Sequence, residues 1–427
     1  MIPENIQISK LANGLTFITI DQPWNKGIYC YSLVKVGSGD EQLERDKGIC
    51  HFLEHMVFRG TEEYTKDDMN KMIPGRGGYF NAATSISYTA YNMWSQIEYL
   101  EDSLSVLENL IFKPLISSDS LEIERNIIIE EIMEHESDPS NKAFEKASSL
   151  LYPNHNFRFP IAGSQESVKN ITATRMKEYL RGYYRPQTTI LALCGALPEP
   201  DKLEDILYKK AHGFVRKTRG SNSSVLQRNF GDTEFDKNNY DNNEVWENLK
   251  SSSSMIAVPY NAKDLFREER IGLNVLSNMV GGYSNSIMFK KIRDDEGLCY
   301  SCGCFNTILI DHLGCFSFYF YSRKENIKKA DDQLEKILKQ ICDGKFSEAD
   351  LEESKNNIVG SMIRNLESGG FLTKCIAGNF MTDDDRYKTS PWEVGEMTKK
   401  VTKKQVVELA NKIFKNNKSK YTIYNHE

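Results

Sequence analysis

Two stretches of this 427-residue chain, separated by 230 positions, share one pattern. Residues 102–131, laid over residues 332–361 without a gap, have eight identities, at Asp102, Leu104, Ile111, Ser117, Leu121, Glu122, Asn126 and Ile128. The order of expected helices and strands around the two stretches is also similar. The sequence therefore predicts a tandem duplication, in which two homologous domains are built from the same elements.

A pair of histidines lies in the first copy. His51 and His55 fall in a helix that we expect over residues 47–58, with Asp46 as its N-cap, so the two rings lie one turn apart on one face. Neutral imidazole is a common zinc ligand, and Glu54 beside the pair can accept a proton from water at the metal. The alternative is a pair of hydrogen-bonded core histidines. The chain has only 7 histidines, and their spacing favours a metal site.

A second helix, expected over residues 120–136, contains two further candidate ligands. Its apolar stripe is formed by Leu121, Ile127, Ile128 and Ile132. Glu124 and Glu131 fall inside this stripe, and a buried carboxylate is costly without a partner, so both are expected to face a cation. One alternative for Glu131 is an ion pair with an arginine or lysine. We favour zinc, because the two histidines need a third ligand.

The second copy lacks these groups. The positions aligned with the two histidines and the two glutamates hold Gly281, Asn285, Ser354 and Ser361. The sequence thus predicts metal chemistry in the first domain only, and another purpose for the second.

One candidate for that purpose is the corner around Gly297, which is expected to end a helix and turn the chain into a strand. Arg293 and Tyr300 flank this corner, and both side chains can donate to an oxyanion. The alternative places Arg293 in a surface ion pair and Tyr300 in the core.

Composition excludes several classes of protein. The net charge of −6 argues against nucleic acid as the main partner, and no apolar run approaches the ~18 residues of a membrane-spanning helix. The amino-terminal residues lack the pattern of a signal peptide, and the odd number of cysteines, 9, favours reduced thiols. We therefore expect a cytoplasmic protein.

Four of the cysteines form a group whose role the sequence leaves open. Cys299 and Cys302 have C-x₂-C spacing, with Cys304, His312 and Cys315 close behind, so a second, structural zinc is one interpretation. A strand over residues 299–310 would point the first two thiols to opposite faces, which favours buried thiols packed as small apolar groups.

The remaining pattern predicts a mixture of short strands and amphipathic helices. Strands are expected over residues 15–20, 28–36, 79–92 and 189–197, and helices over 65–72, 98–112 and 175–184. A polar stretch, 218–253, indicates a linker with one edge strand. We predict domains over 1–217 and 231–427, joined by a linker over 218–230.

Taken together, these residues resemble the pitrilysin–insulysin family of inverted-motif zinc peptidases, which includes the mitochondrial processing peptidases and many bacterial relatives. The match rests on residues 51–55 (HFLEH), 77–84 (GGYFNAAT), 124–126 (ERN) and 183–186 (YYRP), and on Glu131, Arg293, Gly297, Leu298 and Tyr300. The resemblance implies two homologous α+β domains, each a mixed sheet backed by helices, which close like a clam around a chamber.

The resemblance also implies a role for each site residue. His51, His55 and Glu131 would bind one zinc ion per chain, Glu54 would be the general base, and Glu124 would support the ligands from behind.

Arg293 and Tyr300 match a pair that reaches across to stabilise the transition state, in contrast to the surface-and-core alternative above. Asn81 and Ala82 match an edge strand to which an extended peptide adds by backbone pairing. Ala83 departs from the family pattern, since an aromatic residue is common there.

The function implied is a zinc-dependent endopeptidase that cleaves extended or unfolded peptides and works as a homodimer or as a heterodimer with a related subunit. One alternative is a non-catalytic or partner-dependent subunit of a peptidase complex. Another is a zinc hydrolase that acts on something other than peptides.

Overall fold

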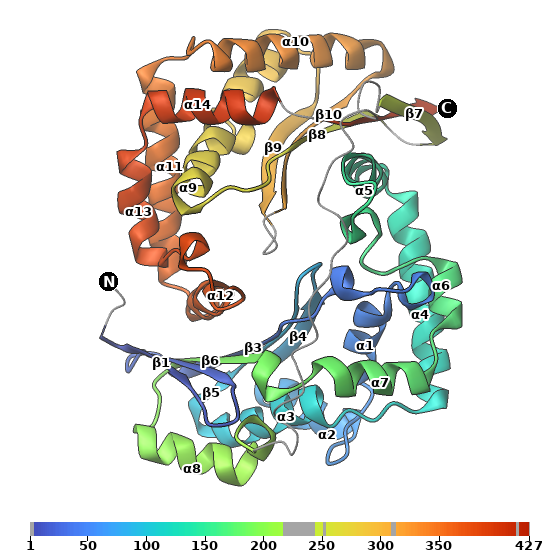
Figure 1. Ribbon diagram of the computed structural model, residues 1–427, viewed down its shortest axis with the longest axis vertical. Helices are drawn as coiled ribbons and strands as arrows, with labels where there is room; N and C mark the ends of the chain where they lie inside the picture. Colours follow the sequence, from blue (N-terminus) through green and yellow to red (C-terminus); the bar gives the residue numbers. More distant parts are fainter. Residues whose placement is uncertain (1–3, 217–243, 251–252, 309–312, 416–417, 427) are drawn as a thin grey trace. The chain divides into compact units, whose positions relative to one another are not determined.

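The computed structural model describes residues 4–216, 244–250, 253–308, 313–415 and 418–426. The chain forms two compact units, each built on one mixed β-sheet (Figure 1). The first unit comprises Met1–Ile132, Pro160–Phe230 and Asn365–Asp383, and the second comprises Met133–Phe159, Gly231–Arg364 and Asp384–Glu427. Each unit thus includes one segment that a linear division of the chain would assign to the other unit. The predicted linker over 218–230 lies outside the described residues, and the predicted domain bounds stay a prediction.

The first unit contains a six-stranded sheet in the order β1-β2-β6-β3-β5-β4. Its strands are β1 (Ile6–Lys10), β2 (Thr16–Asp21), β3 (Gly27–Val34), β4 (Tyr79–Thr84), β5 (Thr89–Gln96) and β6 (Thr189–Gly195). The helices are α1 (Ile49–Val57), α2 (Lys66–Met72), α3 (Leu100–Phe112), α4 (Ser118–Ser137), α6 (Gln165–Asn170), α7 (Ala173–Tyr183), α8 (Pro200–Lys210) and α12 (Gly369–Asn379). Helix α12 lies on the face of the sheet opposite to α3, where Gly369 and Gly370 lie against the ring of Tyr29 (Figure 1).

The second unit contains a five-stranded sheet in the order β7-β11-β8-β10-β9. Its strands are β7 (Glu244–Lys250), β8 (Ser254–Asn261), β9 (Ser301–Ile308), β10 (Gly314–Ser322) and β11 (Lys420–His426). The helices are α5 (Pro139–Leu151), α9 (Arg267–Ser277), α10 (Lys324–Cys342), α11 (Glu348–Leu366), α13 (Pro391–Lys400) and α14 (Lys403–Phe414). Even-numbered residues of β8 face the core beneath α9, α10 and α14, and odd-numbered ones pack against α5.

The duplication is visible in the two sheets. The order β2-β6-β3-β5-β4 of the first unit matches β7-β11-β8-β10-β9 of the second, and the directions agree pair by pair, with one parallel pair at the same place in each. Helices α4 and α11 begin 230 residues apart, as do α5 and α12. The predicted α+β fold with two homologous sheets is confirmed.

Three local predictions need correction. The single strand expected over 79–92 is a hairpin of β4 and β5, because the backbone turns at 85–88, where Ser85 N–H donates to Tyr88 O (2.8 Å). Helix α1 begins at Ile49 rather than near residue 47. Its N-cap is Gly48, and Asp46 instead accepts hydrogen bonds from Arg175.

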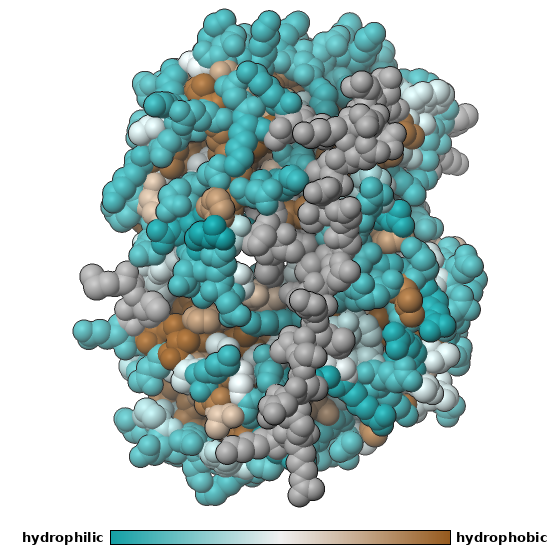
Figure 2. Space-filling model, viewed as in Figure 1, coloured by the Kyte–Doolittle hydropathy of each residue, from teal (hydrophilic) through white to brown (hydrophobic). Residues whose placement is uncertain are grey.

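Two further findings concern the surface. On the face drawn in Figure 2, hydrophilic residues dominate and hydrophobic ones show in scattered patches, in keeping with the many charged residues of the sequence. Within the described ranges, no helix has the length and apolar character needed to cross a membrane.

Candidate active site

Helix α1 presents the two histidines of the motif. All its other faces are buried, through Ile49, Cys50, Phe52, Leu53, Met56 and Val57. The rings of His51 and His55 have centroids 4.7 Å apart, and their side chains are 12% and 23% exposed. The i, i+4 spacing therefore places two imidazoles side by side at the edge of a rigid core, as predicted.

Helix α4 brings a carboxylate to this pair. Glu131 Oε1 lies 3.6 Å from His51 Nε2, and Glu131 Oε2 lies 3.5 Å from His55 Nε2. Among the ion pairs of the described residues, those of Glu131 are with these histidines and not with an arginine or lysine. The expected apolar stripe of α4 is too wide, however, because Ile127 is 42% exposed and the Glu131 side chain 48%. Glu124, Ile128 and Ile132 face the core.

The three side chains fit a zinc ion. One ligand atom from each of His51, His55 and Glu131 lies within 4.8 Å of the others, and no other such group of histidine, cysteine or acidic side chains occurs among the described residues. Tetrahedral zinc with bonds of ~2.1 Å separates its ligand atoms by about 3.4 Å, close to the two distances above. Two imidazole nitrogens and one carboxylate oxygen are a common zinc donor set with an open fourth position.

Glu124 lies behind His55. Its Oε2 is 3.1 Å from His55 Nδ1, and its Oε1 accepts a hydrogen bond from Arg59 Nε. An Nδ1–H bonded to this carboxylate leaves the lone pair of Nε2 facing Glu131, which is the tautomer that a metal ligand needs. The contact agrees with the supporting role that we predicted for Glu124.

Glu54 is held by strand β4. Thr84 Oγ1 donates to Glu54 Oε2 at 2.8 Å, which fixes the carboxylate beside the histidine pair. Burial raises the pKa of Glu54, although the bond from Thr84 opposes this shift. A carboxylate with a raised pKa is a better proton acceptor than one in water.

The two histidines have different electrostatic surroundings. Burial, helped by the neighbouring His55, lowers the pKa of His51 to about 4, so this ring is neutral and free to bind a cation near pH 7. Burial also disfavours a charged His55, but the bond with Glu124 and the carboxylates of Glu54 and Glu131 outweigh it and raise the pKa of His55. The carboxylates of Glu54, Glu124 and Glu131 thus surround His55 with negative charge, and this charge favours the binding of a divalent cation.

Asn81 and Ala82 lie on β4, the last strand of the first sheet. Within the described part of the chain, strand β4 pairs only with β5, and its side chains alternate between exposed and half-buried. The other edge of β4 thus presents backbone groups of the kind that pair with an added strand. It lies next to α1 and carries the Thr84 that contacts Glu54.

Arg293 and Tyr300 belong to the second unit. The guanidinium of Arg293 lies 4.3 Å from the ring centroid of Phe289 and 5.9 Å from that of Tyr300. Tyr300 is 84% exposed, so the alternative that placed it in the core is wrong. Gly297, with φ +60°, follows the end of the helical segment Phe289–Asp295, as predicted.

The cysteine group of the second unit is buried. Cys299, Cys302, Cys304 and Cys315 are free thiols that are at most 8% exposed. Cys299 precedes β9 rather than lying in it, so the strand alternation that was expected to turn the thiols of Cys299 and Cys302 to opposite faces does not apply. The expectation that these thiols are buried is confirmed, while His312, the other member of the possible zinc group, lies outside the described residues.

Two contacts of the site were not predicted from the sequence: Arg59 with Glu124, and Thr84 with Glu54. Arg59 lies four residues after His55, so its side chain is expected on the same side as that ring. This spacing could have suggested Arg59 as the partner of the Glu124 carboxylate. Thr84 gave no local signal, because its contact with Glu54 depends on how β4 packs against α1.

Sheet order, duplication and the histidine–glutamate cluster define a two-domain fold with a candidate metal centre in the first domain. Residues 17–165 match the family model for insulinase (peptidase family M16), and residues 170–358 match the model for the peptidase M16 inactive domain. The chain belongs to the M16 family of peptidases. The inactive-domain match agrees with the absence of the aligned ligands from the second copy.

Curated relatives agree with this placement in the family, and solved structures are similar in fold. The chain is 26% identical over 412 residues to an uncharacterized zinc protease of Rickettsia felis, covering 96% of this chain and 95% of that protein. It is 26% identical over 414 residues to the mitochondrial-processing peptidase subunit beta of Saccharomyces cerevisiae, covering 94% and 87%.

In fold, the chain is similar to a protease from Helicobacter pylori, with a TM-score of 0.88, 20% identity and coverage of 98% and 99%. An M16-like peptidase from Alicyclobacillus acidocaldarius gives a TM-score of 0.83, with 18% identity and coverage of 100% and 99%.

Proposed function

We propose that this chain is a zinc-dependent endopeptidase that cleaves extended or unfolded peptides. The observation that carries the proposal is the convergence of His51, His55 and Glu131, with Glu54 held beside them by Thr84. The names of the relatives, zinc proteases and a processing-peptidase subunit, support the same class of reaction.

His51, His55 and Glu131 would hold the ion, and Glu124 with Arg59 would fix the tautomer of His55. A bound zinc ion would supply Lewis-acid chemistry, polarising a peptide carbonyl and acidifying water. Glu54 accepts the proton of the attacking water on its carboxylate and then passes it to the leaving amine. Thr84 keeps that carboxylate oriented through both transfers, and burial keeps its basicity high.

The edge of β4 is the place where we propose that the substrate binds. An extended peptide that pairs with the backbone around Asn81 and Ala82 would run beside Glu54, because Thr84 on the same strand contacts that carboxylate. Pairing through the backbone is largely independent of sequence, which suits unfolded peptides. Arg293 and Tyr300 are assigned to oxyanion stabilisation on the family resemblance, and the exposure of the Tyr300 phenol is compatible with a donor role.

The test uses purified protein and a mixture of unstructured peptides, with and without a chelator. We expect cleavage that the chelator abolishes and added zinc restores. Cleavage that persists without metal would contradict the proposal. Metal binding without hydrolysis would favour the alternative of a partner-dependent subunit.

A second proposal concerns assembly. One relative is named as a subunit, which favours a chain that works in a homodimer or with a related partner. The mass of the native particle, compared with the 49.0 kDa chain, tests this. A monomer with full activity would contradict it. The predicted cytoplasmic location is likewise a proposal, testable by cell fractionation.

A further inference from the structure

The amino-terminal end of α1 has no cap of its own. The N-cap residue is Gly48, which has no side chain and a φ of +92°. A helix leaves its first backbone N–H groups without partners inside the helix, and burial makes them costly if nothing accepts them. Ile49 and Cys50, which open α1, are at most 1% exposed. This end of the ligand helix must therefore be satisfied by another part of the chain.

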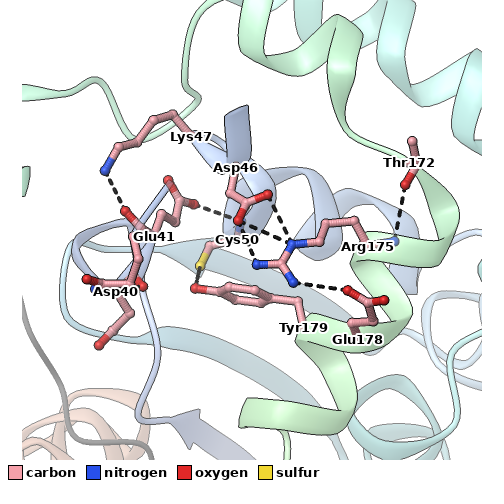
Figure 3. A network of polar contacts seen from close by, with 10 residues as sticks. Asp40, Glu41, Asp46, Lys47, Cys50, Thr172, Arg175, Glu178 and Tyr179 are labelled. Atoms are coloured by element: carbon pink, nitrogen blue, oxygen red, sulfur yellow. Dashed lines mark hydrogen bonds and ion pairs between the residues drawn. The ribbon is translucent and has the colours of Figure 1, made fainter. Parts of the chain in front are cut away.

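Glu41 supplies the missing acceptors (Figure 3). Its Oε2 accepts from the N–H of Gly48 and its Oε1 accepts from the N–H of Cys50, both at 2.9 Å. The Glu41 side chain is buried, with 1% of the residue exposed, and Lys47 Nζ donates to its backbone oxygen at 2.5 Å. One carboxylate thus accepts hydrogen bonds from two backbone N–H groups in the turn that contains His51.

Other contacts hold the same region without touching these N–H groups. Asp46, 2% exposed, accepts from Arg175 Nη2 at 2.7 Å, and Cys50 Sγ lies 3.3 Å from the hydroxyl of Tyr179 (Figure 3). Both partners lie on α7, so these contacts tie the segment before and within α1 to a neighbouring helix. Unlike Glu41, they make no hydrogen bond to the backbone N–H groups of the first turn of α1.

We infer that Glu41 is a positioning residue of the metal centre, acting through the backbone of α1 on the ring of His51. The inference rests on the proposed function. His51 directly follows Cys50, so a shift of the Cys50 amide moves the ligand, and a ligand atom must be held within about 0.5 Å of its productive place. Glu41 therefore acts as a helix cap from outside the helix, and the Cys50 N–H that it accepts from belongs to the residue directly before the ligand His51.

The experiment compares Glu41→Gln with Asp46→Asn as a matched control. Both change a buried carboxylate to an amide in the same network, but only the first changes the acceptors of the α1 N–H groups. Zinc affinity is measured by competition with a chelating dye, and hydrogen exchange is measured over residues 48–56 of the metal-free protein. We expect Glu41→Gln to lower zinc affinity by about 10- to 100-fold, as removal of a group that orients a ligand typically does, and to speed exchange. Asp46→Asn should keep zinc affinity within about threefold.

Wild-type zinc affinity and exchange in Glu41→Gln would overturn the inference, and so would an equal loss of affinity in Asp46→Asn. If Glu41→Gln does not fold, Glu41→Asp serves the same test, because it keeps the charge and draws the acceptors back by one methylene. A wild-type protein that binds no zinc would overturn the proposed function instead. The exchange measurement would still decide whether Glu41 holds α1.

Discussion

Replacing Glu54 by glutamine tests the proposed chemistry most directly. The change keeps the shape of the side chain and one oxygen for the bond from Thr84, but it removes the proton acceptor. General-base catalysis contributes about 10²–10⁴ in rate, so we expect kcat to fall about 10³-fold, or ~4 kcal/mol of transition-state stabilisation. Zinc content should stay at the wild-type level, because Glu54 is not in the group of three candidate ligands.

The assay is cleavage of an internally quenched peptide, with elemental analysis of the same preparation. Thr84→Val is the graded control. It leaves the Glu54 carboxylate in place and removes one hydrogen bond to a charged group, about 1.5 kcal/mol, so kcat should fall about tenfold. A Glu54→Gln enzyme with normal zinc and more than a tenth of wild-type kcat would refute the general-base assignment.

Three more changes test other parts of the site. Glu131→Ala should abolish zinc binding and cleavage. Because this side chain is 48% exposed, the free energy of unfolding of the metal-free protein should stay within about 0.5 kcal/mol of the wild-type value. Unchanged metal content would remove Glu131 from the ligand set. Ile128→Ala, one turn earlier and 0% exposed, should lower that free energy by about 2–5 kcal/mol in a denaturant titration, and a loss below 1 kcal/mol would contradict the packing described. Tyr300→Phe should lower kcat about 10²-fold with little change in KM; an equal effect on KM alone would assign Tyr300 to substrate binding.

Sequence periodicity predicted much of the local structure. The spacing of His51 and His55 fixed two rings on one face of a helix, because 3.6 residues per turn leave little freedom at four residues. In the same way, the helical spacing of the apolar residues between 121 and 132 predicted α4, and the 230-residue shift predicted α10 and α11 in the second copy. The positions of these side chains and helices depend on residues close together in the sequence, so tertiary packing has little effect on them.

Contacts between distant segments were decided by the tertiary structure. The meeting of Glu131 with both histidines depends on how α4 packs against α1, and the exposure of Ile127 shows that the periodicity alone misjudged the width of the buried face. The same holds for Thr84 against Glu54 and for Arg59 against Glu124. The exchange of α5 and α12 between the two units left no trace in composition.

The sequence by itself determined the duplicated α+β fold and a helix that bears two imidazoles, because helical geometry and repetition are written in residue spacing. The tertiary structure decided which carboxylate joins them, which hydroxyl holds Glu54 and that Glu41 caps α1 from outside. The physical reason is that helix geometry fixes distances within an element, whereas distances between elements follow from the packing of whole side-chain surfaces.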